Sequence, residues 1–130
     1  MSAPNFAPPT PKTFTASEDL TQYRFIKIGS SANTVDAADA VTDVCFGVVT
    51  EDVDFSEATE ASVWLLNEGG IVPIEAAAAI SLGANIAPST NGRGQTAVST
   101  QFTRGIALQA ASGAGHVIPM LVQVQETVIA

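Results

Sequence analysis

Hydrophobic residues occur along this chain in short runs that are separated by segments rich in turn-forming residues. Eight such runs follow residue 22, namely YRFIKI, VCFGVV, SVWLL, IVPI, ANIA, TAVST, GIALQA and HVIPMLVQV. Glycine, asparagine and serine are concentrated between them, as in NEGG, STNGRG and ASGAG. Short runs with a turn every eight to twelve residues are typical of small β-barrels and β-sandwiches. We therefore predict a mainly β fold, a small single-domain barrel or sandwich of about eight strands.

The pattern leaves room for at most one short helix. Residues 75–80, EAAAAI, have helical propensity, but isolated helices shorter than about 12 residues are marginal. We expect at best a helical turn or two there, packed on the sheet, with an extended loop as the alternative. Pro73 and Pro119 lie inside predicted strands, and a proline cannot donate a ladder hydrogen bond. We therefore place both prolines at sheet edges or bulges.

Two segments of the sequence are similar to each other. Residues 46–66 and residues 104–122 each contain a glycine, two or three apolar residues, an alanine-containing loop and an apolar strand, in that order. A repeated order of this kind predicts two β-hairpins of similar design.

The first 14 residues differ in composition from the rest of the chain. Each of their four prolines fixes its own φ and keeps the preceding residue out of the helical region, so this segment is extended. Phe6 and Phe14 bracket the prolines and provide apolar surface that needs a partner. We therefore divide the chain into an extended N-terminal arm, residues 1–14, and a single β-rich domain, residues 15–130. A frayed terminus is the alternative interpretation of the arm.

The charge distribution argues against nucleic acid as a partner. The net charge is −8, and residues 28–75 contain ten acidic residues and no lysine or arginine. Proteins bind DNA and RNA largely by neutralising phosphates with basic residues, and the five lysines and arginines here are scattered. No apolar stretch approaches the roughly 18 residues of a membrane span, and the N-terminus does not read as a signal peptide. We expect a soluble protein that is synthesised in the cytoplasm.

Reactive side chains are few. His116 is the only histidine, and we expect it to be a turn or strand residue and not a general base. Cys45 lies in the apolar run VCFGVV, where we expect a small buried hydrophobic residue. The stretch DVDFSE, residues 52–57, begins with the one-three-five oxygen spacing of a calcium loop, but Glu57 stands where glycine is required and Val63 where the bidentate glutamate is required. This leaves at most a weak calcium site made from Asp52, Asp54 and Glu57. We predict no catalytic, metal-binding or cofactor-binding residue and no enzymatic activity.

Several segments follow one another in an informative order. They are TFTASEDLTQYRFIKIGSS, FGVVTEDV, ASVWLLNEGGIVPIEAAAAISLGANIAPSTNGRGQTA and TRGIALQAASGAGHVIPMLV. Over about residues 13–122 this series resembles the small capsid decoration, or cement, proteins of tailed bacteriophages. The resemblance implies a β-rich protein on the outer surface of the virion, which binds the major capsid protein and stabilises the expanded head. It also implies homotrimers at local three-fold positions and no catalytic residues.

Under this resemblance, the N-terminal arm is the candidate contact site. An arm stiffened by prolines loses less backbone entropy on docking than a flexible one. We expect the arm to reach the capsid shell or a neighbouring decoration subunit through Phe6, Pro8, Pro9, Pro11 and Phe14. A trimer would engage several capsid subunits at once, so that avidity multiplies a modest single-site affinity.

Two other functions stay open at this point. A non-enzymatic β-sandwich that binds carbohydrate or a host receptor would expose Trp64 or Tyr23 for stacking. A small hydrolase or lyase domain would use His116 with an acidic residue. Arg93 and Arg104 are the only cations after Lys27, and they could pair with acidic residues of another subunit.

Overall fold

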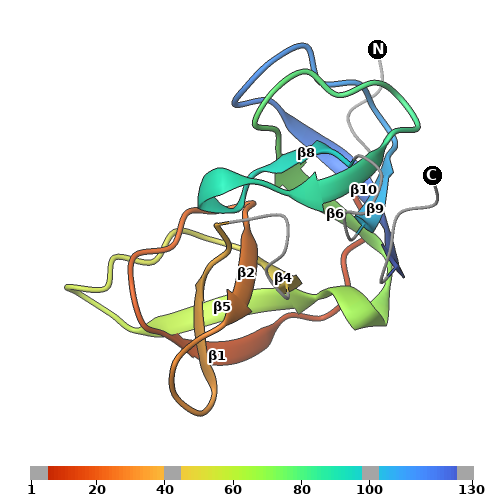
Figure 1. Cartoon of the computed structure of the whole chain (residues 1–130). Coiled ribbons are helices and arrows are strands. Elements are labelled where there is room, and N and C mark those ends of the chain that lie inside the picture. The colour runs from red at the N-terminus through yellow and green to blue at the C-terminus, as the bar shows by residue number, and fades with distance from the viewer. Residues whose placement is uncertain (1–5, 40–44, 98–102, 126–130) are drawn as a thin grey trace.

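The computed structural model describes residues 6–39, 45–97 and 103–125. The described residues form a closed barrel and a second, five-stranded sheet, and their helices are two 3-10 turns, η1 (Leu66–Glu68) and η2 (Thr90–Gly92) (Figure 1). No helix in this part of the chain is long and apolar enough to cross a membrane. The prediction of a mainly β fold is confirmed. The strands are β1 (Lys12–Ala16), β2 (Phe25–Ile28), β3 (Thr34–Ala37), β4 (Cys45–Val49), β5 (Glu60–Leu65), β6 (Ile71–Glu75), β7 (Asn85–Pro88), β8 (Gly94–Thr96), β9 (Thr103–Ala107) and β10 (Val117–Gln125).

The first five strands close into a barrel in the order β1-β3-β2-β4-β5. β1 completes the ring, since it pairs with β5 in antiparallel and with β3 in parallel register. Side chains alternate along the strands: in β5, Ala61 and Val63 are fully buried, whereas Glu60 is exposed. The interior is filled by one apolar cluster: Ala16, Leu20, Ile26, Val35, Val49, Val53, Ala61 and Val63.

The second five strands repeat the connectivity of the first five. β6 pairs with β10, β10 with β9, β9 with β7 and β7 with β8, all antiparallel. The equivalent pairs in the barrel are β1–β5, β5–β4, β4–β2 and β2–β3, also all antiparallel. Where β1 and β3 pair in parallel over two positions, β6 and β8 are joined by one parallel bridge, Ala76 with Gly94. Residues 12–65, the first unit, and residues 72–122, the second unit, are therefore two copies of one topology.

The hairpins β4–β5 and β9–β10 match in detail. Each has a glycine, Gly47 or Gly105, beneath a side chain of the neighbouring strand. A Cβ atom would lie 2.4 Å from Cγ1 of Val63 if added to Gly47, and 2.4 Å from Cγ of Met120 if added to Gly105. Neither position accepts a side chain without rearrangement. The similarity that the sequence predicts between these two hairpins is confirmed.

The two units share a core. Phe25 and Val48 face each other across β2 and β4, are fully buried, and belong to the apolar cluster that fills the second unit. Cε2 of Phe25 lies 3.8 Å from the position of a Cβ atom on Gly94. The second unit is thus packed around side chains from the first. This cluster contains Phe25, Ala38, Cys45, Val48, Leu66, Val72, Ile74, Ala76, Ile80, Ile86, Ala107, Ala111, Ile118 and Met120.

The helical propensity of residues 75–80 is not realised. β6 ends at Glu75, and an extended segment with a bend leads to Ile80, which forms an isolated β-bridge. The backbone N–H groups of Ala76 and Ala77 each donate to a carbonyl oxygen of another segment at 2.8 Å. A helix of six residues would lose these bonds, and it is too short for its internal hydrogen bonds to offset the free energy of nucleation. Of the two alternatives for this segment, the structure has the extended loop and no helical turn, which agrees with the prediction of at most one short helix.

Pro73 and Pro119 face each other across β6 and β10. Alternate pairs of an antiparallel ladder exchange no backbone hydrogen bonds, so two prolines can face each other at such a pair. β6 is an edge strand, as predicted for Pro73. β10 is an interior strand, so the expected edge or bulge is wrong for Pro119. The Pro119 carbonyl oxygen accepts from the N–H of Leu108, the residue that follows the end of β9. Because β9 ends there, the hydrogen bond that a residue with an N–H would donate at position 119 is not needed to continue the ladder.

Candidate functional site

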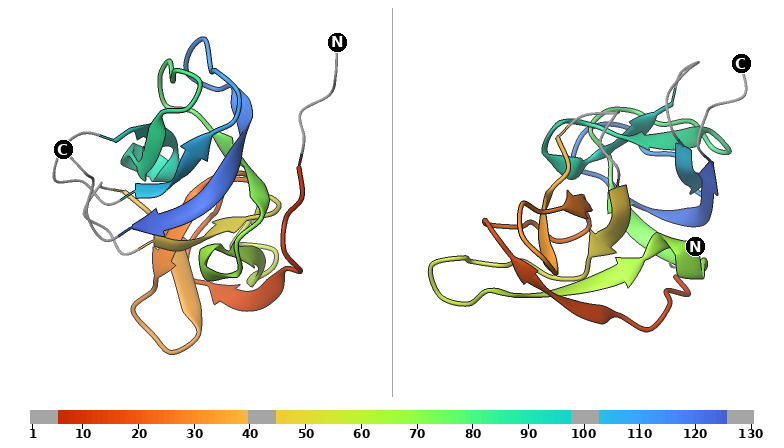
Figure 2. Two further views of the ribbon diagram at one scale, coloured as in Figure 1. Left: turned by 90° about the vertical axis from the view of Figure 1, so that its right-hand side faces the viewer. Right: turned by 60° about the horizontal axis from the view of Figure 1, so that its bottom comes forward.

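Residues 6–11 form an extended strap that leaves β1 and runs beside the second unit (Figure 2). Ala7 pairs with Ile71, at the start of β6, through two backbone hydrogen bonds of 2.9 and 3.0 Å. Gly70 allows this approach, because its φ is 99° and a Cβ atom there would lie 2.6 Å from the carbonyl oxygen of Ala7. The strap is therefore attached to its own chain by one short bridge.

The five predicted contact residues fall into two groups. Phe6, Pro8 and Pro11 are exposed on the strap, with 42% of Phe6 accessible, and Pro9 is half-buried. Phe14 lies within β1 and is half-buried. The strap thus presents an aromatic ring and two prolines to solvent, whereas Phe14 belongs to the wall of the barrel.

The Phe14 side chain borders an apolar groove on the barrel. Its ring meets the edge of Phe46, with the ring centroids 5.4 Å apart and an angle of 69° between the planes. Cys45 is 4% exposed at the same place and packs in the shared core, so the prediction of a small buried hydrophobic residue is confirmed. The groove is lined by Phe14, Cys45, Phe46, Leu65, Leu66 and Asn67.

The loops at one end of the barrel form an acidic tip, which we define as residues 17–22 and 50–59. The carboxylates of Asp19 and Asp52 each accept a hydrogen bond of 2.8 Å from a backbone N–H group of the opposite segment. These side chains hold the two loops together. The acidic tip carries no lysine or arginine, and its acidic residues are Glu18, Asp19, Glu51, Asp52, Asp54 and Glu57.

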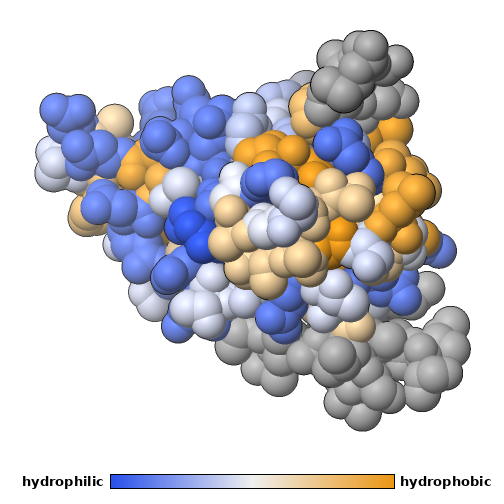
Figure 3. Space-filling model, turned by 90° about the horizontal axis from the view of Figure 1, so that it is seen from above, coloured by the Kyte–Doolittle hydropathy of each residue, from blue (hydrophilic) through white to orange (hydrophobic). Residues whose placement is uncertain are grey.

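The equivalent loops of the second unit form a neutral tip, which we define as residues 77–82 and 108–116. These segments contain no Asp, Glu, Lys or Arg and are joined by an isolated β-bridge. Leu82 is 69% exposed and Leu108 is 39% exposed. Figure 3 looks down on the molecule from the side of the second unit and shows hydrophobic surface toward its centre and right, with hydrophilic surface on the left, the side of the acidic loops in Figure 1.

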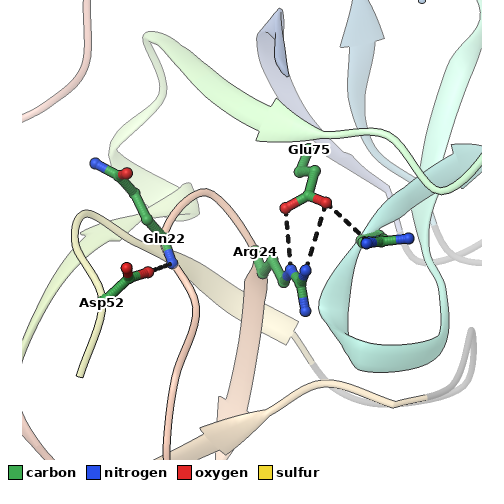
Figure 4. Close-up of polar contacts among 5 residues, drawn as sticks. Gln22, Arg24, Asp52 and Glu75 are labelled. Atoms are coloured by element: carbon green, nitrogen blue, oxygen red, sulfur yellow. Dashed lines mark hydrogen bonds and ion pairs between the residues drawn. The ribbon is translucent and has the colours of Figure 1, made fainter. Parts of the chain in front are cut away.

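An ion network joins the two units. The Glu75 side chain, on β6, is 14% exposed; it accepts a hydrogen bond of 3.1 Å from Nε of Arg24 and forms an ion pair with Arg93, whose Nε lies 2.9 Å from the carboxylate (Figure 4). Arg24 also donates through Nη2 at 3.4 Å. Arg93 is therefore paired within its own chain. Arg104 is 4% exposed and donates to the carbonyl of Thr103, so the structure does not present it to another subunit.

The structure does not bring the candidate reactive residues together. His116 is exposed beside the hydroxyl of Ser112, at 3.2 Å, whereas Cys45 is buried in β4. Asp54 accepts hydrogen bonds from the N–H and hydroxyl of Ser56 within its own loop. Among residues 6–39, 45–97 and 103–125, no three His, Cys, Asp or Glu side chains are grouped to hold a metal ion.

A polar hollow on the flank of the barrel is also lined by acidic residues, Glu18, Asp36 and Asp39 among them. Glu18 accepts from the backbone N–H of Ala37 at 2.9 Å, and Asp36 accepts from the hydroxyl of Ser17. Asp39 accepts from a backbone N–H in η2 at 3.3 Å. These carboxylates connect strands and loops of the chain itself, and their arrangement does not converge on one point.

Tyr23 and Trp64 stack on each other, with centroids 6.4 Å apart and planes inclined by 5°. Both side chains are half-buried, and Trp64 packs against the shared core. A carbohydrate platform needs an open aromatic face, and each ring here uses one face for its partner. The arrangement therefore favours a packing role for both residues.

Sequence reasoning did not single out Leu82 and Leu108. The feature of the sequence that could have drawn attention to them is the absence of charge around them, since residues 76–92 and 105–125 contain no Asp, Glu, Lys or Arg. An exposed leucine in such a stretch differs from a core leucine only in its position relative to the turns, which the sequence pattern does not specify.

Comparison with known proteins identifies the family. The model of the phage cement protein family matches residues 10–123. No curated protein matches the chain. Among solved structures, the N base of head fiber gp8.5 in bacteriophage phi29 superposes with a TM-score of 0.69 at 17% sequence identity, covering 92% of this chain and 97% of that chain. This likeness shows a shared fold.

The family match covers the barrel, the second unit and the last residues of the strap. It agrees with the resemblance seen in the order of the sequence segments. The chain belongs to the phage cement protein family, a family of structural, non-enzymatic proteins associated with the capsid of the phage head.

Proposed function

We propose that this protein decorates the outside of a phage head by binding the shell of the major capsid protein, and that it stabilises the head after expansion. It acts as a homotrimer at local three-fold positions on the outer surface of the virion. The observation that carries this proposal is the family match over residues 10–123.

Two apolar surfaces support an adhesive role. The strap carries Phe6 and three prolines, and the groove beside β1 is lined by Phe14, Phe46 and Leu65. Exposed apolar surface of this kind favours protein partners. The carboxylates, in contrast, are largely occupied by hydrogen bonds within the chain.

We assign the contact with the capsid shell to the strap. Its prolines restrict the backbone, and its bridge to Ile71 fixes one point of its path. Docking therefore costs less than the roughly 1–2 kcal/mol per residue that ordering a flexible backbone requires. Phe6 is the side chain best placed to fill a pocket on the shell, and Pro8 and Pro11 flank it with rigid apolar surface.

Purified protein mixed with undecorated heads tests this function. We expect the protein to sediment with expanded heads and not with unexpanded heads, and to raise the temperature at which expanded heads rupture. Sedimentation with neither form would contradict the proposal.

A matched pair of variants tests the role of the strap. Phe6 and Phe55 are similarly exposed, at 42% and 45%, but lie on the strap and on the acidic tip. Phe6→Ala should weaken binding to expanded heads about tenfold or more, as for an aromatic anchor, and Phe55→Ala should leave it unchanged. Equal binding by both variants and the unmodified protein would remove the strap from the contact.

A further inference from the structure

The neutral tip presents large apolar side chains that the fold does not require. Leu82 is equivalent to Gln22 of the first unit, because each precedes a positive-φ residue, Gly83 or Tyr23. The N–H of that residue donates to the carbonyl of the last residue of β9 in the second unit and of β4 in the first. The first unit thus has a half-buried polar residue at this position, and the second unit has a leucine that is 69% exposed. Packing within the chain does not explain the leucine.

Leu108 follows the same rule. Its N–H donates to the carbonyl of Pro119, as the N–H of Thr50 donates to the carbonyl of Ser62 in the first unit. The first unit therefore has a threonine where the second has a second exposed leucine. The other exposed residues of the neutral tip are Ala78, Ala79, Ser81, Gln109, Ala110, Ser112, Ala114, Gly115 and His116, and all of them except Gln109 and His116 are small.

The neutral tip is also well ordered in its backbone. Ile80 and Ala111 exchange two hydrogen bonds of 2.9 Å, and the N–H of Gly115 donates to the carbonyl of Ala76 at 2.8 Å. A partner that covers this surface buries apolar area without paying for the ordering of a loop. The surface has the character of a preformed contact.

The charge distribution determines through which tip a second copy of this protein can make contact. A second copy carries the same net charge of −8, and contact through the acidic tip would oppose six carboxylates to six. Such like-charge contacts are strongly disfavoured. Contact between two neutral tips opposes no Asp, Glu, Lys or Arg side chains, because the tip contains none. The small residues around the leucines permit close approach.

We propose that the neutral tip is the surface through which copies of this protein contact one another. The two tip segments contain fewer residues than the 20–30 that a standard interface uses on each side, so the contact is weak for an isolated pair. On the proposed function, copies that are already held on one shell meet at high effective concentration, and a weak contact then links neighbours.

Sedimentation velocity of the purified full-length protein over a range of concentrations tests this surface without heads. We expect association that grows with concentration. Leu82→Glu should shift the association to concentrations at least about tenfold higher, because it replaces buried apolar area with a repelling charge. Gln22→Glu adds the same charge at the equivalent position of the first unit and should not change the association. Leu82→Ser is the milder variant and should weaken it in the same direction.

Three results would overturn this inference: a monomer at every concentration, equal association of Leu82→Glu and the unmodified protein, or equal loss in Gln22→Glu. Urea unfolding of each variant establishes that its fold is intact. Binding to expanded heads separates the two proposals. If Leu82→Glu associates normally but no longer binds heads, the neutral tip faces the capsid protein, which overturns the self-contact and leaves the decoration function standing.

Discussion

Val35 fills the interior of the first unit, whereas the equivalent position of the second unit is Gly94, as their pairing with β2 and β7 shows. The ring of Phe25, which comes from the first unit, lies beside this glycine. The first unit is closed by its own side chains, and the second is completed by its neighbour. Two copies of one topology can therefore have the same strand pairing although only one of them has a core made entirely of its own side chains.

The two tips show a second difference. Each contains one isolated backbone bridge, Leu20 with Val53 and Ile80 with Ala111. In the acidic tip, carboxylates also accept hydrogen bonds from backbone N–H groups, whereas in the neutral tip the N–H of Gly115 donates to a backbone carbonyl. Acidic side chains are thus part of the local structure in one copy, whereas the leucines of the other copy are exposed to solvent.

Phe25→Ala is the strongest test of the dependence between the units. Phe25 is fully buried in the shared core, and its truncation should cost about 3–5 kcal/mol of the free energy of unfolding. Asn85, the equivalent residue of the second unit, is exposed, and Asn85→Ala should cost less than about 0.5 kcal/mol. Urea unfolding measures both values.

The same experiment tests whether the units unfold together. Because the cavity lies in the shared core, fluorescence of Trp64 in the first unit and circular dichroism of the whole chain should shift to the same lower urea concentration. Two separate transitions would show that the second unit keeps a core of its own.

Gly105→Ala and Gly47→Ala should have the next largest effects. A Cβ atom on Gly105 would lie 2.6 Å from the carbonyl oxygen of Leu121, and one on Gly47 would lie 2.9 Å from that of Trp64. Overpacking of this kind costs about 1–3 kcal/mol. The loss should be larger at Gly105, where the opposing backbone atom is closer, and thermal unfolding of the two variants gives the order. A neutral substitution at either glycine would contradict the equivalence of the hairpins.

The sequence predicts the strands that contain continuous apolar runs, such as β4, β5 and β10, and it predicts the similarity of the two hairpins. It does not predict β1 or β3. These strands, KTFTA and TVDA, each place one fully buried side chain in the barrel, Ala16 or Val35, so no apolar run marks them. For this reason the end of the arm was predicted too late in the chain: β1 begins at Lys12, within residues 1–14, the segment expected to be the arm.

The candidate surfaces are predictable only where composition marks them. The prolines near Phe6 are visible in the sequence as an extended segment. The link between Arg24 and Glu75 joins residues 51 positions apart, and it depends on how the second unit packs on the first. Likewise, the exposure of Leu82 depends on the exact place of a turn. Long-range packing of this kind leaves no local pattern to read.

Glu75→Gln tests the polar part of the junction between the units. The carboxylate accepts hydrogen bonds from Arg24 and forms an ion pair with Arg93 while 14% exposed, so the amide should cost about 1–2 kcal/mol of the free energy of unfolding. Thr15 holds the equivalent position in β1 and is exposed, so Thr15→Val should be close to neutral. Urea unfolding compares the two. A loss at Glu75 that vanished in 1 M salt would indicate a solvent-exposed ion pair, contrary to its burial.

Asp52→Ala should have the smallest effect and bears on the structural role of the acidic tip. The Asp52 carboxylate accepts from the backbone N–H of Gln22 at 2.8 Å, and an exposed hydrogen bond of this kind contributes about 0.5–1 kcal/mol. Its loss should speed amide exchange at Gln22 about two- to fivefold, if this amide opens locally. Glu51→Ala removes the same charge from a side chain that has no hydrogen bond or ion pair with the described residues, so it isolates the bond from the charge. Unchanged exchange in Asp52→Ala, or equal changes in both variants, would mean that the carboxylates of this tip act through their charge and do not hold its loops.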